Sequence, residues 1–123
     1  VIPRFILAAV KGEPLQIHGD GKQSRDLTYI DNIVAGNILA ATQPLGKYDV
    51  FNIACGERFT VLQIGETIGR ILGKKIIYQH TPPRVGDVRH TQADITLARK
   101  YLKFRPVVDF AEGMKRTVDF FTK

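Results

Sequence analysis

Two short segments of the sequence place arginine near glycine and aspartate in a pattern suited to binding an anion. In residues 19–26 a glycine turn precedes Arg25, and in residues 82–89 a pair of prolines precedes Arg84. A guanidinium matches phosphate oxygens in a bidentate way, and a neighbouring carboxylate can fix its orientation. Two such arginines that converge in space suit a diphosphate. The alternative is that each arginine only forms a surface ion pair with a nearby aspartate, worth less than about 1 kcal/mol.

The sequence contains none of the common signatures of a catalytic or cofactor site. It has no Gly-x-Gly-x-x-Gly or Gly-x-x-Gly-x-x-Gly run, no Walker loop, no Gly-x-Ser-x-Gly and no His-Glu-x-x-His. None of the four tyrosines has a lysine four positions later, and the three histidines share no metal-ligand spacing. We therefore expect no catalytic residue, no cofactor-binding residue and no metal ligand in this chain.

Composition limits the classes of protein to which the chain can belong. With 123 residues, 44% hydrophobic and 24% charged, it has the make-up of one globular domain. The net charge of +6 is dispersed, and the apolar runs are too short to span a bilayer. We therefore expect neither nucleic acid nor a membrane as a partner. Because Cys55 is the only cysteine, no intrachain disulfide is possible, and we expect a cytoplasmic protein with an inert core thiol.

The elements that must position the arginines begin with a helix and a pair of extended segments. A helix over residues 4–11 follows Pro3 and closes at Gly12. Alternating apolar and polar residues predict a strand over 15–18, and residues 25–30 return as a second extended piece. We expect these two pieces to form a hairpin or an extended pair that carries Arg25.

A second helix and a buried strand are predicted in the middle of the chain. Asp31 is expected to cap a helix that ends before Pro44. The apolar residues predicted to share its buried face are Ile33, Val34, Ile38 and Ala41. Residues 49–55 are β-branched and aromatic with little alternation, which predicts a strand in a sheet covered on both faces.

The next predicted helix begins at a capping box and carries regularly spaced glycines. Thr60 and Gln63 have the spacing of that box, and the helix runs to Leu72 and stops at Gly73. Two further glycines on it, four residues apart, are Gly65 and Gly69. This spacing predicts close packing of the helix against a neighbouring element.

The last third of the chain is predicted to contain a strand, a loop and two helices. The strand covers residues 75–80, and residues 81–91 form an irregular loop because paired prolines cannot join a ladder. Asp94 and Asp109 are expected to cap the two helices, the second with Glu112 in a capping box. Because helices and strands alternate throughout, the sequence predicts an α/β arrangement.

Several longer motifs occur in one order along nearly the whole chain. They are Val-Ile-Pro-Arg-Phe at 1–5, Gly-Glu-Pro-Leu-Gln-Ile-His-Gly-Asp-Gly at 12–21, Ser-Arg-Asp-Leu-Thr-Tyr-Ile-Asp-Asn at 24–32, Tyr-Asp-Val-Phe-Asn-Ile-Ala at 48–54 and Arg-Val-Gly-Asp-Val-Arg-His-Thr-Gln-Ala-Asp at 84–94. In this order they resemble the C-terminal part of extended short-chain dehydrogenase/reductases, specifically nucleotide-sugar epimerases and dehydratases. The Arg-x-Gly-Asp-x-Arg-His form looks like UDP-sugar 4-epimerases, particularly those that act on N-acetylhexosamines.

The resemblance implies a division of labour between two halves of a longer enzyme. In such enzymes an N-terminal Rossmann half binds NAD and supplies the catalytic Tyr-x-x-x-Lys pair, while the C-terminal part holds the nucleotide diphosphate of the UDP-sugar. Residues 1–123 would then be the substrate-binding portion, a small domain with at least one strand of the parent parallel sheet. We accordingly expect Val1, which is not a methionine, to be a cut or processed end.

The resemblance also assigns roles to individual residues, which contact the base, the diphosphate or the ribose. They are Gln16, Ile17 and His18 along the base, Arg25 and Arg84 on the diphosphate, Asn52 beside the nucleotide and Asp87 at the ribose. His18 departs from the family, which often has an aromatic residue at this place. Imidazole stacks less extensively on uracil, so the preferred base stays open.

Other functions remain compatible with the same residues. A sugar-nucleotide 4,6-dehydratase or decarboxylase would share this half, and a stand-alone module could bind nucleotides without catalysis. A basic nucleic-acid binder would need clustered Lys and Arg, which are missing. The expected partners are a UDP-sugar and the Rossmann half. Homo-oligomers are also possible, because a strand cut from its sheet at residues 51–54 would leave apolar surface exposed.

Overall fold

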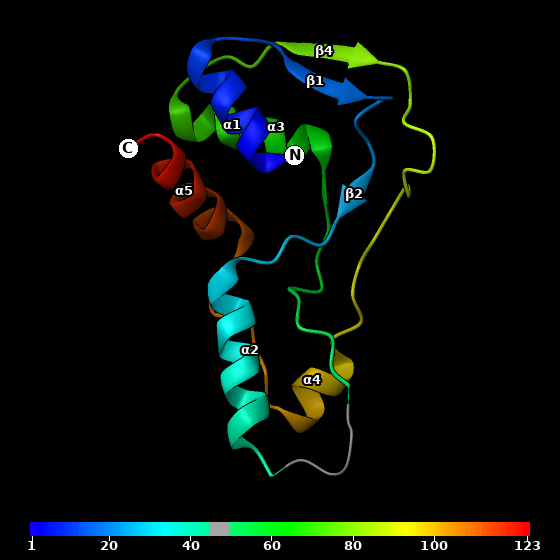
Figure 1. Cartoon of the computed structure of the whole chain (residues 1–123), viewed down its shortest axis with the longest axis vertical. Coiled ribbons are helices and arrows are strands. Elements are labelled where there is room, and N and C mark those ends of the chain that lie inside the picture. The colour runs from blue at the N-terminus through cyan, green and yellow to red at the C-terminus, as the bar shows by residue number, and fades with distance from the viewer. Residues whose placement is uncertain (45–49) are drawn as a thin grey trace.

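A computed structural model describes residues 1–44 and 50–123 of the chain (Figure 1). The helices and strands in these ranges are, in chain order, α1 (Ile2–Lys11), β1 (Leu15–His18), β2 (Ser24–Arg25), α2 (Ile30–Thr42), β3 (Phe59–Thr60), α3 (Val61–Leu72), β4 (Tyr78–Thr81), α4 (Thr96–Tyr101) and α5 (Phe110–Phe121). No helix in the described part of the chain is long and apolar enough to cross a membrane.

The strands pair in two separate two-stranded sheets. β1 and β4 run parallel, from Leu15 opposite Tyr78 to His18 opposite Thr81, whereas β2 and β3 are antiparallel. The predicted hairpin or extended pair of residues 15–18 and 25–30 is therefore wrong. A parallel pair needs a long crossover, and α3 supplies it between β1 and β4, so the edge of β1 is occupied by a strand far along the sequence.

The part of the molecule formed by α1, β1, α3, β4 and α5, here called the upper body, surrounds one core (Figure 1). Its helices are amphipathic and turn their apolar faces toward the strands and one another. The buried residues of this core are Phe5, Ile6, Ala9, Leu15, Ile17, Val61, Ile64, Ile68, Met114 and Val118. The upper body thus closes its own core with elements of this chain.

Two local predictions for α3 are confirmed. The Gln63 backbone N–H donates to Thr60 Oγ1 at 3.1 Å, and the Thr60 N–H donates to Gln63 Oε1 at 2.7 Å, which completes the capping box. A Cβ on Gly65 would lie 2.8 Å from the Tyr78 hydroxyl, and one on Gly69 would lie 2.6 Å from Cγ1 of Ile76. The regularly spaced glycines therefore let α3 lie directly against the segment that leads into β4.

The part formed by α2, residues 50–54 and residues 96–104, which include α4, is here called the lower arm and has a much smaller core (Figure 1). The buried residues in its cluster are Ala98, Leu102 and Phe104. Asn32 of α2 is fully buried, and its side-chain amide makes several hydrogen bonds to the backbone. Its Oδ1 accepts from the Val107 and Val108 N–H groups at 2.7 and 2.9 Å, and its Nδ2 donates to the Val108 carbonyl at 2.7 Å. One amide therefore fastens α2 to the segment before α5.

The start and the faces of α2 differ from the prediction. The helix begins at Ile30 with Tyr29 as its N-cap, so Asp31 lies in the first turn and accepts from Arg116 instead. Val34, Ile38 and Ala41, predicted to be buried, are exposed. The reason is that α2 is apolar on nearly every side, and a periodicity argument cannot choose which side the rest of the chain will cover.

The strand predicted over residues 49–55 is not present in its described part, and Asp49 itself lies outside the described residues. A strand requires a neighbour to accept its hydrogen bonds. The N–H groups of Cys55 and Gly56 instead donate to the Asp26 carboxylate at 3.2 and 2.9 Å. Residues 50–55 therefore form no strand in this structure, and the prediction that Phe51 to Ala54 belong to the parallel sheet of a longer enzyme stays a prediction.

The two C-terminal caps are correct in part. Asp109 is the N-cap of α5 and accepts from the Glu112 N–H at 2.9 Å, but the Glu112 carboxylate pairs with Arg116 and does not complete a capping box. Asp94 accepts from the Thr96 N–H at 2.9 Å from one position before the N-cap of α4, which is Ile95. Both carboxylates nonetheless satisfy an N–H at a helix start.

Candidate functional site

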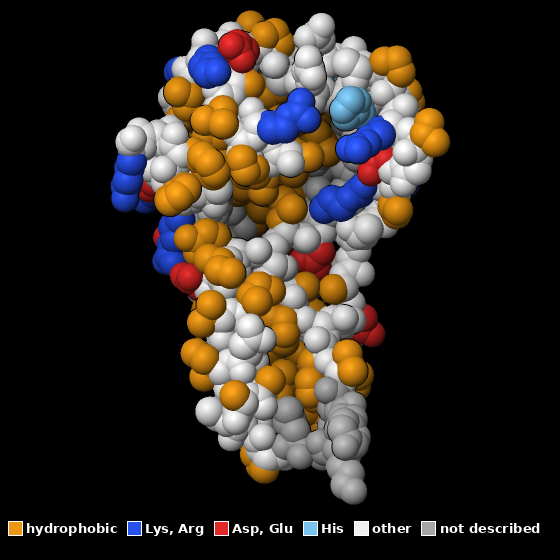
Figure 2. Space-filling view, viewed as in Figure 1, with side chains coloured by type: hydrophobic (Ala, Val, Ile, Leu, Met, Phe, Trp, Pro, Cys, Tyr) orange, Lys and Arg blue, Asp and Glu red, His pale blue; other side chains and the backbone are white. Residues whose placement is uncertain are grey.

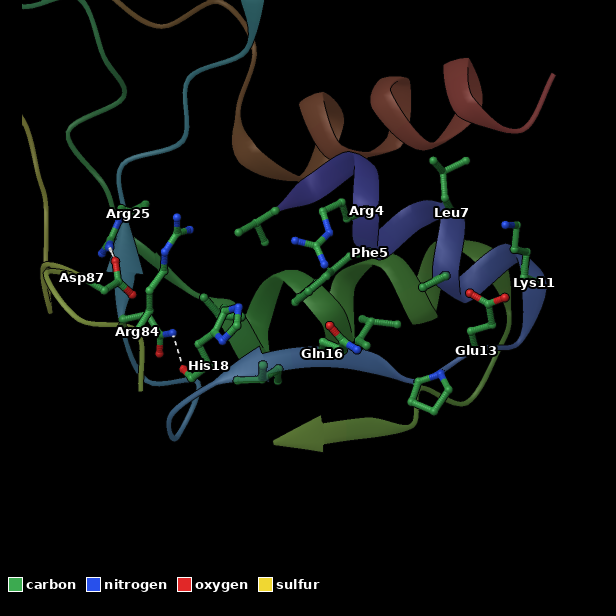
Figure 3. A pocket seen from close by; sticks show the side chains of 17 residues that line it. Arg4, Phe5, Leu7, Lys11, Glu13, Gln16, His18, Arg25, Arg84 and Asp87 are labelled. Atoms are coloured by element: carbon green, nitrogen blue, oxygen red, sulfur yellow. Dashed lines mark hydrogen bonds and ion pairs between the residues drawn. The ribbon is translucent and has the colours of Figure 1, made fainter. Parts of the chain in front are cut away.

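A groove of about 560 Å³ opens in the upper body between α1, β1 and the loop that precedes α4 (Figure 3). Six of the seven residues predicted to bind a nucleotide line it. These are Gln16, Ile17, His18, Arg25, Arg84 and Asp87. The seventh, Asn52, does not line this groove, and its Nδ2 donates to the Asp94 carbonyl at 3.1 Å. The fold thus brings together residues up to 71 positions apart, while the role of Asn52 stays a prediction.

β1 supplies one edge of the groove, and its alternation explains which side chains are available. Gln16 and His18 are exposed, whereas Ile17 is buried in the core of the upper body. Nδ1 of His18 shares a 2.8 Å hydrogen bond with Oγ1 of Thr81, its register partner on β4. Pairing of β1 with β4 therefore fixes the His18 ring beside the groove.

A tight turn accounts for the Arg-x-Gly-Asp spacing. Gly86 has a φ of 81°, and the Asp87 N–H donates to the Arg84 carbonyl at 3.2 Å. A positive φ inside a four-residue turn is adopted readily by glycine and rarely by other residues. The turn therefore places Arg84 and Asp87 at its two ends, both beside the groove (Figure 3).

The ion pairs in the groove are not those between sequence neighbours. Nη2 of Arg25 donates to Oδ1 of Asp87 at 2.5 Å, so the two segments singled out by their arginines meet here. Asp26 instead accepts backbone N–H groups from the segments around Gly56 and Ala93. A carboxylate that orients a guanidinium is thus present, but it comes from the other loop.

The sequence interpretation missed the opposite wall of the groove, which α1 provides. Arg4, Leu7, Ala8 and Lys11 line it, because positions three, four and seven apart share one face of a helix. Within the described residues neither Arg4 nor Arg84 forms an ion pair. The spacing on α1 was a visible signal, but only the packing of α1 beside β1 shows that this face borders a groove.

The charges around the groove favour an anion. Four basic side chains, Arg4, Lys11, Arg25 and Arg84, and two acidic ones, Glu13 and Asp87, line it. Figure 2 shows basic side chains and a histidine around a hollow with a hydrophobic floor. An apolar floor with positive walls suits a ligand that has both a flat ring and a phosphate. No cluster of acidic, histidine and cysteine side chains that could hold a metal ion occurs in ranges 1–44 and 50–123.

Comparison with known proteins agrees with this arrangement. A sequence model described as the NAD dependent epimerase/dehydratase family matches residues 1–54. A UDP-glucuronate 4-epimerase from Thermodesulfobacterium geofontis is 41% identical over 118 residues, which is 95% of this chain and 36% of that protein. A UDP-N-acetyl-alpha-D-glucosaminuronate decarboxylase from Bacillus cytotoxicus is 28% identical over 127 residues, 98% of this chain and 39% of that protein.

The fold agrees as well. The crystal structure of a UDP-glucuronic acid 4-epimerase from Bacillus cereus, in complex with UDP-glucuronic acid and NAD, superposes with a TM-score of 0.92 at 30% identity. The match covers 99% of this chain and 40% of that one. The chain is thus similar to the NAD dependent epimerase/dehydratase family in residues 1–54 and to UDP-sugar 4-epimerases over nearly its whole length. The α/β class predicted from the sequence, with its likeness to Rossmann-like epimerases, is confirmed. The chain spans between a third and two fifths of the length of these family members.

Proposed function

We propose that the groove holds the nucleoside diphosphate of a UDP-sugar, and that residues 1–123 are the substrate-binding portion of an NAD-dependent UDP-sugar 4-epimerase. The observation that carries this proposal is the convergence of Arg25 and Arg84 with Asp87 at one end of the groove. Two guanidinium groups beside a carboxylate that can orient one of them suit the adjacent phosphates of a diphosphate. The matched epimerase crystallised with UDP-glucuronic acid supports the same ligand class.

In this proposal the nucleotide lies along the groove. The base lies beside Gln16 and His18 on β1, and the ribose lies toward Asp87. The diphosphate contacts Arg25 and Arg84. Contacts to this remote part of the substrate orient the sugar for reaction, because binding energy far from the reacting atoms is available for positioning.

We expect residues 1–123 to contain no complete site for NAD. The sequence has no glycine fingerprint for a dinucleotide, and it lacks a Tyr-x-x-x-Lys pair. NAD, which supplies oxidation and reduction of the sugar in this family, would therefore be held by another part of a longer polypeptide. The groove residues contribute by binding the nucleotide and positioning the sugar, and no proton transfer is assigned to them.

Steady-state kinetics on the complete polypeptide tests the proposal. With UDP-glucuronate or UDP-galactose as substrate, Arg25→Ala and Arg84→Ala should each raise KM about 10- to 100-fold, because each removes a charge-assisted hydrogen bond to phosphate. The turnover number should fall much less. Arg105→Ala, which removes an exposed arginine outside the groove, is the control and should leave KM unchanged. Unchanged KM in both groove variants would refute the assignment.

A decarboxylase is the second candidate, because a UDP-sugar decarboxylase is among the relatives. It would use the same groove, since the nucleotide part of the substrate is the same. Product analysis separates the reactions. An epimerase returns a sugar of unchanged mass, a decarboxylase releases carbon dioxide from a uronate, and a 4,6-dehydratase leaves a keto-sugar. A complete polypeptide that binds UDP and converts no UDP-sugar would instead be a nucleotide-binding module.

A further inference from the structure

The loop that carries Arg84 and Asp87 has no helix or strand of its own to hold it in place. It leaves β4 after Thr81 and runs beside β2 toward α4 (Figure 1). Backbone pairing resumes only at its far end, where the Ser24 N–H donates to the Arg89 carbonyl at 2.9 Å and the Thr91 N–H donates to the Ser24 carbonyl at 3.1 Å. Between Thr81 and Arg89 the described backbone hydrogen bonds of the loop are limited to its own Arg84–Asp87 turn, so side-chain contacts contribute to its position.

Two side-chain ion pairs join the loop to the rest of the molecule: one, at Asp87, lies inside the groove, and the other, at Arg89, lies outside it. The inside contact is the ion pair of Arg25 with Asp87. A phosphate that binds Arg25 would compete with that carboxylate for the guanidinium. The outside contact is a two-pronged ion pair, in which Nη1 and Nη2 of Arg89 donate to Oδ1 and Oδ2 of Asp20, each at 2.8 Å. Neither Asp20 nor Arg89 lines the groove, so this pair does not compete with a ligand there.

Asp20 is itself held in a fixed position. It lies in the turn after β1, where its Oδ1 also accepts the Lys22 N–H at 2.9 Å. The hydrogen bonds from Arg89, and then that from Lys22, hold the pKa of the Asp20 carboxyl well below its usual range. The neighbouring Gly21 has a φ of 73°, and a Cβ at this position would lie 2.8 Å from Cγ of Leu62. The turn therefore packs directly against α3. Asp20 thus connects the loop to the upper body through a short, fixed turn.

We propose that Asp20 and Arg89 are positioning residues for the groove: their ion pair keeps the Arg84–Asp87 turn in place so that Arg84 faces the bound anion. This inference rests on the proposed function. An exposed ion pair contributes little to the stability of a fold. A bidentate pair does fix orientation, because both carboxylate oxygens and both guanidinium nitrogens are engaged. Its effect is therefore expected in ligand affinity and much less in the free energy of unfolding.

Calorimetric titration of the complete polypeptide with UDP tests this inference. Asp20→Asn retains an acceptor for the Lys22 N–H but removes the negative charge. Arg89→Ala removes the guanidinium group that donates to Asp20. Both should weaken UDP binding about 5- to 20-fold with little change in melting temperature, and Arg89→Lys should fall between wild type and Arg89→Ala. Arg116→Ala removes exposed ion pairs with Asp31 and Glu112, none of which lines the groove, and should leave UDP affinity unchanged.

A double variant shows whether the pair acts through Arg84. In an Arg84→Ala background, Asp20→Asn should weaken UDP binding no further, because the group that the pair positions is already absent. A loss in that background as large as in the wild type would overturn the inference. So would UDP affinities within twofold of wild type in both Asp20→Asn and Arg89→Ala. If the wild-type polypeptide does not bind UDP at all, the proposed function itself fails, which separates the two failures.

Discussion

The upper body and the lower arm both contain helices with many apolar residues, yet only the upper body closes a core. Each helix of the upper body has one apolar face, and the ten buried residues of its core meet between α1, α3, α5 and the β1–β4 pair. The lower arm buries a cluster of three residues, while Ile30, Val34 and Ile38 of α2 remain 59, 48 and 58% exposed. A helix that is apolar on every side needs cover on every side.

This difference matters for the groove. Most groove-lining residues belong to the upper body, whose core is complete within this chain, whereas Arg25, Arg84 and Asp87 belong to β2 and to the loop before α4. Binding geometry is held best on rigid, well-packed elements. The lower arm, in contrast, presents an apolar helix face that the described residues do not cover. We therefore expect the groove to keep its shape under changes that open the lower arm.

The largest expected effect tests whether the upper body is closed. Ile68→Ala removes a fully buried side chain from its core and should lower the free energy of unfolding by about 3–4 kcal/mol, because it leaves a cavity. Urea denaturation of residues 1–123 measures this loss. The control Ile77→Ala alters a residue that is 57% exposed and should change stability by less than about 0.5 kcal/mol. Equal effects of the two substitutions would contradict a closed core.

The next effect concerns the amide that fastens the lower arm. Asn32→Ala leaves the N–H groups of Val107 and Val108 and one carbonyl without partners, which should cost about 3 kcal/mol. Thermal unfolding followed by circular dichroism gives the loss. Asn37→Ala, on the exposed side of the same helix, is the matched control and should be nearly neutral. A neutral Asn32→Ala would mean that the lower arm is held by something other than this amide.

A smaller effect tests the uncovered face of α2. In residues 1–123, the double variant Val34→Lys/Ile38→Lys should leave stability nearly unchanged and should reduce self-association in sedimentation velocity, because both side chains are exposed. In the complete polypeptide the same variant should lower stability by about 2 kcal/mol, because charges would enter a covered face. The same small effect in both proteins would show that this face is simply a solvent-exposed surface.

The smallest expected effect concerns the reactivity of the Cys55 thiol, which directly follows residues 50–54 of the lower arm. Burial, followed by the nearby Asp26 carboxylate, raises the pKa of Cys55 above its ordinary value of 9.0. The thiol should therefore react slowly with a disulfide reagent at pH 8, and faster in urea concentrations that open the lower arm. The thiol ionises more easily in the unfolded chain than in the folded one. Its contribution to the free energy of unfolding is therefore complete below pH 9 and decreases as the pH rises above 9. Cys55→Ala should remove that alkaline loss, and an unchanged loss would assign it to another group.

The sequence predicted some helices and strands correctly and others not. The helices with one apolar face and a recognisable cap, such as α1 with Gly12 and α3 with Thr60, follow from local rules. The strand predicted over residues 49–55 is not formed in residues 50–55, because strand formation depends on a neighbour that the local sequence does not specify. The partner of Arg25 was also unpredictable, since Asp87 is 62 residues away and Asp26 is adjacent.

By itself, the sequence determined six of the residues that line the groove and the short turn that presents Arg84 and Asp87, because an arginine, a glycine with positive φ and an aspartate at this spacing act over four residues. Tertiary structure alone decided that the two arginine segments meet, that α1 forms the opposite wall with Arg4, and that Asp20 holds Arg89. These contacts depend on the crossover through α3 that pairs β1 with β4. Local preferences extend over one turn, whereas such a crossover is selected by the burial of a whole core.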